Sequence, residues 1–125
     1  MSLSINIRQM NDVSVMDVTG RITLGDDART LRDMLLTMPK EGHKKILLNL
    51  AEAAYIDSSG LGVLVSGFAS MTNQGGQLKL LNLTKRVRDL LLITKLFTVF
   101  EVFDDEELAL RSFAEVAVQA PGAVA

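Results

Sequence analysis

The sequence predicts an α/β domain in which a mixed β-sheet, opened by a hairpin, is packed against about four helices. Strand-like and helix-like hydrophobic patterns follow one another in the order β-β-α-β-α-β-α-β-α. Only a short turn separates the first two strands, so they form a hairpin, whereas a helix separates each later pair. The 125 residues match the usual size of one domain and contain no internal repeat or linker.

The chain opens with the predicted hairpin and then a helix. Residues 3–7 alternate between apolar and polar side chains, which is the pattern of a strand with one buried face. After an Asn-Asp turn, residues 13–18 form the second strand. An apolar stripe over residues 28–38 then predicts a helix that Asp26 or Asp27 caps.

A central strand and a second helix flank the segment Asp57–Gly60. The run Ile46–Leu50 is nearly continuously apolar, which at this length favours a strand covered on both faces. Beyond the segment, apolar residues recur at helical spacing over residues 61–72, and the positions between them are small. This pattern predicts a largely buried helix.

The last third of the chain continues the alternation of strand and helix. A strand begins over residues 78–83, and Thr84 can cap the third helix. A short strand over Val99–Phe103 precedes the fourth helix. Asp104 and Glu107 have the spacing of a capping box at the start of that helix.

Composition indicates a soluble globular protein. We expect one domain over residues 1–117 and a frayed tail over residues 118–125, which lack periodicity. The 13 basic and 15 acidic residues give a net charge of −2, which is too balanced for a nucleic-acid binder. The start does not have the pattern of a signal peptide, and no apolar run approaches the ~20 residues that span a bilayer. We therefore expect a cytoplasmic protein with no nucleic-acid partner and no membrane insertion.

Few residues could support catalysis or metal binding. Cysteine is absent and His43 is the only histidine, so thiol chemistry and His-rich metal sites are excluded within one chain. A serine hydrolase would need His43 as the base for Ser58 or Ser59, but neither serine has nucleophile-elbow spacing and His43 lies in a polar loop. The acidic clusters fit helix starts, and the basic residues between Lys85 and Lys95 fit a solvated helix face. We expect no enzyme, no cofactor and no metal.

The segment Asp57–Gly62 is the candidate functional site, because it lies where a strand gives way to a helix. A serine hydroxyl there meets unpaired N–H groups at the positive end of the helix, so a phosphate could be added without melting it. The simpler interpretation is that Asp57 or Ser58 only caps the helix, and that Gly60 and Gly62 only allow close packing. The glycine spacing matches neither a P-loop nor a dinucleotide-binding turn.

The segment Tyr55–Leu64, with its aspartate-serine-serine-glycine core, resembles the STAS domain of anti-sigma factor antagonists. The resemblance covers about residues 3 to 117 in the expected order. It includes four further segments: Val18–Ile22, Ile46–Leu50, Gly75–Leu80 and Leu96–Phe100. It implies a STAS-like fold and a non-enzymatic regulator that binds an anti-sigma factor and thereby releases a sigma factor.

The resemblance also implies which residues carry the regulation. By position, Ser58 is the serine that the anti-sigma factor, itself an ATP-dependent serine kinase, phosphorylates. The phosphorylated form is released, and a serine phosphatase resets it. The implied partner-binding residues are Thr23, Leu24, Gly25, Asp26, Asp57, Ser58, Ser59, Gly60 and Leu61. The sequence departs from the family at Thr23, where an aspartate is often found, and the loop after it is slightly longer.

A second function is compatible with the same resemblance. The chain could be a STAS subunit of a stressosome-like or lipid-transport complex, in which phosphorylation is absent and Asp57-Ser58-Ser59 still forms the contact surface. Neighbouring genes discriminate the two: a kinase and a phosphatase favour regulation by phosphorylation, and permease genes favour transport.

Overall fold

Five strands form one mixed sheet in the order β1-β2-β3-β4-β5. The computed structural model describes residues 3–122, with side chains described over 3–25 and 28–114. The antiparallel hairpin consists of β1 (Ser4–Met10) and β2 (Val13–Ile22). The parallel part adds β3 (Lys45–Ile56), β4 (Gln77–Leu81) and β5 (Val102–Phe103). The predicted mixed sheet with an opening hairpin is confirmed.

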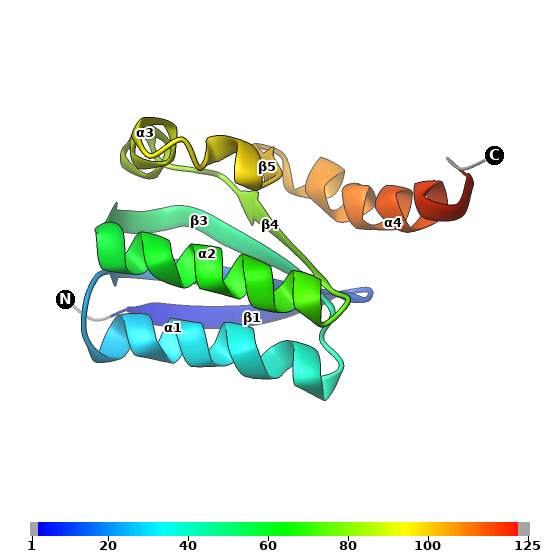
Figure 1. Ribbon diagram of the computed structural model, residues 1–125, viewed down its shortest axis with the longest axis horizontal. Coiled ribbons are helices and arrows are strands. Elements are labelled where there is room, and N and C mark those ends of the chain that lie inside the picture. Colours follow the sequence, from blue (N-terminus) through cyan, green and yellow to red (C-terminus); the bar gives the residue numbers. More distant parts are fainter. Residues whose placement is uncertain (1–2, 123–125) are drawn as a thin grey trace.

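Four helices cover the two faces of this sheet. They are α1 (Asp26–Thr37), α2 (Ser58–Asn73), α3 (Lys85–Ile93) and α4 (Glu106–Gly122), with 3₁₀ turns η1 (Met38–Glu41) and η2 (Phe97–Val99). Helices α1 and α2 lie side by side on one face, and both begin at the end of the molecule where β3 ends (Figure 1). Within the described residues, no helix is both long and apolar enough to cross a bilayer.

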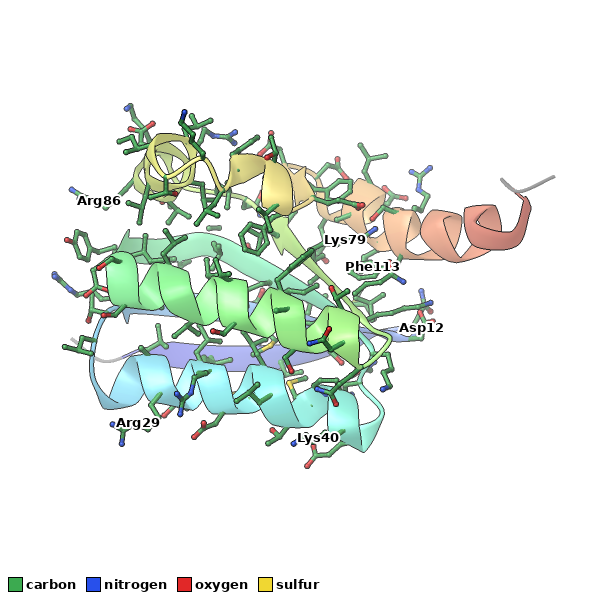
Figure 2. The ribbon with its side chains drawn as sticks, viewed as in Figure 1. Asp12, Arg29, Lys40, Lys79, Arg86 and Phe113 are labelled. Carbon is green, nitrogen blue, oxygen red and sulfur yellow. The ribbon has the colours of Figure 1, made fainter. Side chains whose placement is uncertain are left out.

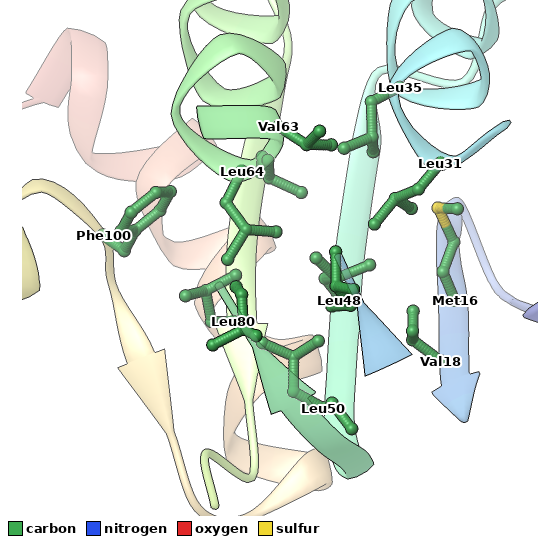
Figure 3. Close-up of a cluster of buried hydrophobic side chains, with 14 of the residues drawn as sticks. Met16, Val18, Leu31, Leu35, Leu48, Leu50, Val63, Leu64, Leu80 and Phe100 are labelled. Atoms are coloured by element: carbon green, nitrogen blue, oxygen red, sulfur yellow. The ribbon is translucent and has the colours of Figure 1, made fainter. Parts of the chain in front are cut away.

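The core has two parts because side chains of the central strand alternate between the two faces of the sheet. Leu48 points toward α1 and α2 and packs in the cluster that also contains Leu31 and Leu64 (Figure 3). Its neighbour Leu47 points the other way and packs against Phe113 of α4 in a smaller cluster. Burial on both faces explains why the sequence of this strand is continuously apolar.

Lys79 is a buried cation that the sequence analysis did not single out. It lies on β4 with 3% of its surface exposed. Its ammonium group donates to Ser112 Oγ at 2.9 Å, pairs with Glu101 Oε1 at 2.9 Å and lies 4.7 Å from the ring centre of Phe113 (Figure 2). These contacts satisfy the charge and attach α4 to the sheet.

Two strands differ in extent from the prediction. β3 continues past Leu50 to Ile56, because its second half still pairs with the end of β2. The strand expected over Val99–Phe103 is wrong in its first part, since η2 occupies Phe97–Val99 and only Val102–Phe103 is extended. Phe100 turns into the core and packs edge-on against Phe68 at 5.4 Å, so the chain bends there before β5 begins.

Two helix caps also differ from the prediction. Helix α1 begins at Asp26 after Gly25, so Asp26 and Asp27 lie inside its first turn and not at its cap. The capping box predicted for Asp104 and Glu107 is wrong: Asp105 caps the helix instead, its Oδ1 accepting the N–H of Leu108 at 3.0 Å, and leucine cannot supply the reciprocal bond. Helix α4 continues to Gly122, through part of the segment expected as a frayed tail; residues 123–125 lie outside the described residues.

Candidate functional site

Asp57 joins three elements at the point where β3 gives way to α2. Its side chain is the N-cap of α2, so of the two caps that the sequence predicted, Asp57 and Ser58, Asp57 is the correct one. Its Oδ1 accepts the N–H of Gly60 at 2.8 Å. Its Oδ2 accepts the N–H of Leu24, in the loop between β2 and α1, at 3.2 Å. Its own N–H donates to the carbonyl of Ile22 at 3.3 Å. One carboxylate therefore holds the Leu24 loop beside the start of α2.

These hydrogen bonds keep Asp57 ionised. The N–H of Gly60 has the largest effect and lowers the pKa of the Asp57 carboxyl below its usual value; burial opposes it by less, and the N–H of Leu24 adds a further, smaller lowering. The site therefore carries a fixed negative charge directly before Ser58 at neutral pH.

Replacing Asp57 by asparagine is expected to lower stability by about 1 kcal/mol at neutral pH. The amide oxygen can still accept the N–H of Gly60, but the charge is lost and the amide NH2 cannot accept the N–H of Leu24. The folded pKa of Asp57 is lowered, so its contribution is present above the unfolded pKa of about 3.9 and is lost as pH falls through the folded pKa. Urea unfolding of both proteins at several pH values tests this. A stability difference that does not shrink as the pH falls from 7 toward 2 contradicts the charge as its cause.

Ser58 and Ser59 open toward two different grooves, a distinction that sequence alone did not make. Both are exposed, and neither hydroxyl forms a hydrogen bond within the described part of the chain. Ser58 lines a groove of about 680 Å³ against α3. Ser59 lines a separate groove of about 380 Å³ against the start of α1. A modification on one serine would therefore meet different neighbours from a modification on the other.

Two exposed apolar side chains flank these serines. Leu24 is 80% exposed and lines the groove of Ser59, while Ile93 of α3 is 77% exposed and lines the groove of Ser58. Exposed large apolar residues beside polar groups are typical of protein contact surfaces. We call Leu24, Asp57, Ser58, Ser59 and Ile93 together the Ser58 surface.

The remaining predicted contact residues lie at different depths. Thr23 is half-buried and Gly25 is exposed in the loop beside the serines, while Asp26 starts α1 and its side chain lies outside the described set. Gly60 and Leu61 are buried, so they support the surface from beneath and do not line it.

The two glycines of the motif also differ. A Cβ on Gly60 would lie 2.0 Å from the carbonyl oxygen of Ile22, so close packing requires glycine there. A Cβ on Gly62 would meet nothing within 4 Å, so the packing explanation is wrong for that residue.

A stack of two arginines on Tyr55 was missed by the sequence analysis. Arg21 is paired with Tyr55 across β2 and β3, and its guanidinium lies 4.8 Å from the ring centre. Arg86, at the start of α3, also lies 4.8 Å from the same ring centre. Only the strand register and the placement of α3 bring these residues together, and no local pattern signals it.

The other basic residues of α3 are engaged elsewhere. Lys85 pairs with Asp89 at 2.7 Å, and Arg88 approaches Asp104 at 3.5 Å and the ring of Phe97 at 5.6 Å. The basic helix face that the sequence analysis expected to be solvated is therefore partly engaged in side-chain contacts.

His43 lies far from both serines. It precedes β3, whereas Ser58 follows it, and the 12-residue strand separates them by roughly 35 Å. Its Nδ1 is 3.3 Å from Oγ of the buried Ser14, so it is half-buried and not the freely solvated histidine expected from its loop. The hydrolase alternative therefore lacks its base. Within the described residues, no group of three His, Asp or Glu side chains could hold a metal ion.

The fold and the site define a class of small α/β domain in which a capped helix presents exposed serines at the carboxyl end of the central parallel strand. The chain belongs to the STAS domain family, whose model matches residues 4–109. Over 103 residues it is 34% identical to the anti-sigma-B factor antagonist of Bacillus subtilis, covering 82% of this chain and 92% of the relative. Over 116 residues it is 24% identical to the anti-sigma F factor antagonist of Paenibacillus polymyxa, covering 93% and 99%.

Solved structures share the fold. An anti-sigma factor antagonist from Mycobacterium paratuberculosis superposes with a TM-score of 0.77 at 17% identity, covering 90% of this chain and 95% of that one. The Bacillus cell fate determinant SpoIIAA in its phosphorylated form gives a TM-score of 0.68 at 19% identity, covering 87% and 99%. At these identities the likeness concerns the fold alone.

Proposed function

We propose that this chain is an anti-sigma factor antagonist. It binds a cognate anti-sigma factor that is also a serine kinase, and this binding releases a sigma factor. Phosphorylation of Ser58 ends the binding, and a serine phosphatase restores it. The role is regulatory, and the kinase and phosphatase chemistry belongs to the partners. Relatives named anti-sigma factor antagonists support the proposal.

The observation that carries the proposal is the exposed Ser58 hydroxyl at the first position of α2. Asp57 already caps the helix, so capping does not need this hydroxyl. It lines a groove with the exposed Ile93, beside the groove that Ser59 and the exposed Leu24 line, where a partner would cover it. A similarly folded protein, SpoIIAA, has been solved in a phosphorylated form, which is compatible with a phosphate on this fold.

The chemistry of a phosphate suits such regulation. Phosphorylation adds about −1.5 to −2 charges and three acceptor oxygens. Inside a contact surface these charges must be desolvated or paired, which costs several kcal/mol where the partner has no matching cations. Because the helix start tolerates anions, the fold itself remains intact.

The proposal is tested by incubating the chain with the anti-sigma factor kinases of the source organism and ATP. Phosphate is then located by peptide mass spectrometry. We expect one phosphate on Ser58, none in the Ser58→Ala variant and unchanged incorporation in Ser59→Ala. No phosphate on Ser58 with any of these kinases would contradict the proposal and favour a contact-only STAS subunit.

Replacing Leu24 by alanine is expected to weaken binding to the anti-sigma factor about 30-fold, equivalent to ~2 kcal/mol. The side chain is 80% exposed, so truncation removes contact area from the complex without opening a cavity in the free protein. Calorimetric titration with a non-hydrolysable ATP analogue present measures the affinity. The matched control is Leu108→Ala, which removes another exposed leucine from α4, and it should bind like the wild type. Equal loss in both variants would count against a contact at Leu24.

A further inference from the structure

The groove beside Ser58 brings a serine hydroxyl and an arginine together from distant parts of the chain. Ser58 lies at the start of α2, and Arg86 lies in the first turn of α3. Both line the same groove of about 680 Å³, together with Tyr55, Asp57, Asp89 and Ile93. Figure 2 shows Arg86 at the end of the molecule where α2 begins.

Arg86 differs from Lys85 and Arg88 of α3 because no anion of the described side chains pairs with it. Lys85 is bound to Asp89, and Arg88 lies beside Asp104. Among the residues that the structure describes, Arg86 makes no ion pair; its guanidinium stacks on Tyr55, 4.8 Å from the ring centre. A guanidinium held over an aromatic ring at an exposed position keeps its N–H donors available.

We infer that Arg86 is the receptor for the phosphate on Ser58: once Ser58 is phosphorylated, the Arg86 guanidinium binds the phosphate oxygens while it remains near Tyr55. This inference rests on the proposed function, because it concerns the phosphorylated state of the same serine. A planar guanidinium matches two phosphate oxygens with two parallel hydrogen bonds, and charge-assisted bonds of this kind are the strong ones. The N–H groups at the start of α2 favour the same anion.

The other charges around Ser58 make the role of Arg86 specific. Asp57 lines the groove and repels a phosphate, whereas Lys85 and Asp89, which also line it, offset each other as an ion pair. Arg29 and Arg32 of α1 line the other groove, with Ser59. Arg21 shares the Tyr55 ring but does not line the groove of Ser58. Of the two cations that line this groove, Lys85 and Arg86, Arg86 is therefore the one whose charge no described carboxylate already offsets.

The consequence is that a residue of the same chain, Arg86, stabilises the phosphorylated state of Ser58. A phosphate paired with Arg86 is less available to a phosphatase than one free in solvent. Removing Arg86 should therefore speed dephosphorylation, whereas it should leave the fold and the unphosphorylated protein unchanged because the side chain is exposed.

The test uses full-length protein with phosphoserine incorporated at position 58 during translation, so that no kinase is needed. The second ionisation of the phosphate is followed by ³¹P NMR. We expect its pKa in the wild type to lie below the usual value of about 6, and the Arg86→Gln variant to raise it by about half a unit or more, a threefold change in proton affinity. The matched controls are Arg88→Gln, on the same helix, and Arg21→Gln, which removes the other guanidinium stacked on Tyr55. Each removes one positive charge and should shift the pKa of the phosphate less than Arg86→Gln does.

Each outcome is decisive. An unchanged phosphate pKa in Arg86→Gln overturns the inference, and so do equal shifts in all three variants, which would show a general field effect. These results do not depend on any kinase. Failure of the kinases to modify Ser58 would contradict the proposed function, whereas failure here would contradict only the pairing with Arg86.

Discussion

Phosphorylation of Ser58 is expected to weaken binding to the anti-sigma factor by about a thousandfold, which corresponds to ~4 kcal/mol. The phosphate would lie on the Ser58 surface, with Ile93 in its own groove and Leu24 in the neighbouring groove of Ser59, where the proposed partner excludes water. The ionised Asp57 carboxylate precedes it, so two negative groups would have to be desolvated together. Against a net charge of −2, one phosphate also about doubles the negative charge of the chain.

The variant Ser58→Asp adds about half of the charge of a phosphate at this position. Its affinity for the anti-sigma factor is therefore expected to fall by a smaller factor, about tenfold to a hundredfold. Ser58→Ala should bind like the unphosphorylated protein. The matched control is Asn73→Asp, which adds one negative charge at the exposed other end of α2, about 22 Å away. Calorimetric titration of the unphosphorylated protein, the phosphorylated protein and the three variants measures the effect. Equal affinity of Ser58→Asp and Ser58→Ala would contradict a mechanism based on charge.

Replacing Gly60 by alanine is expected to destabilise the fold by about 3 kcal/mol or more. A Cβ at this position would lie 2.0 Å from the Ile22 carbonyl oxygen and 2.9 Å from its carbonyl carbon. That carbonyl is backbone at the buried end of β2 and accepts the N–H of Asp57, so it cannot move aside without breaking the junction. The helix start, with Ser58 on it, would have to shift away from the sheet.

Gly62→Ala is the matched control for this prediction. Nothing lies within 4 Å of a Cβ there, and glycine is a poor helix former, so alanine should stabilise the fold by about 0.5–1 kcal/mol. Urea unfolding of both variants gives the free energies. The close approach of α2 to β2 would be refuted by a Gly60→Ala protein as stable as the wild type.

Much of the fold was predictable because its signals are local. Hydrophobic periodicity along the chain gave the order of strands and helices, and Thr84 and Asp57 cap the helices that follow them. Boundaries were harder where a contact distant in sequence decides them. β3 extends to Ile56 because β2 continues beside it, and β5 starts late because Phe100 is drawn into the core.

The sequence was enough to locate the candidate site along the chain, but it did not predict which residues surround the site in space. The motif around Ser58 could be found because a strand end, an N-cap and a helix start follow one another within a few residues. The groove that each serine faces, the burial of Leu61 and the stack of Arg21 and Arg86 on Tyr55 depend on strand register and on where α1 and α3 pack. No local pattern encodes those placements.

The scarcity of reactive residues is a property of the sequence alone: no cysteine and a single histidine leave little chemistry to the chain. Tertiary structure decided the rest. It placed His43 at the other end of β3 from the serines, and it left Ser58 exposed in a groove that the exposed Ile93 also lines. The physical reason is that composition and periodicity act over neighbouring residues. By contrast, a binding surface is made by segments that only the packed sheet brings within contact distance.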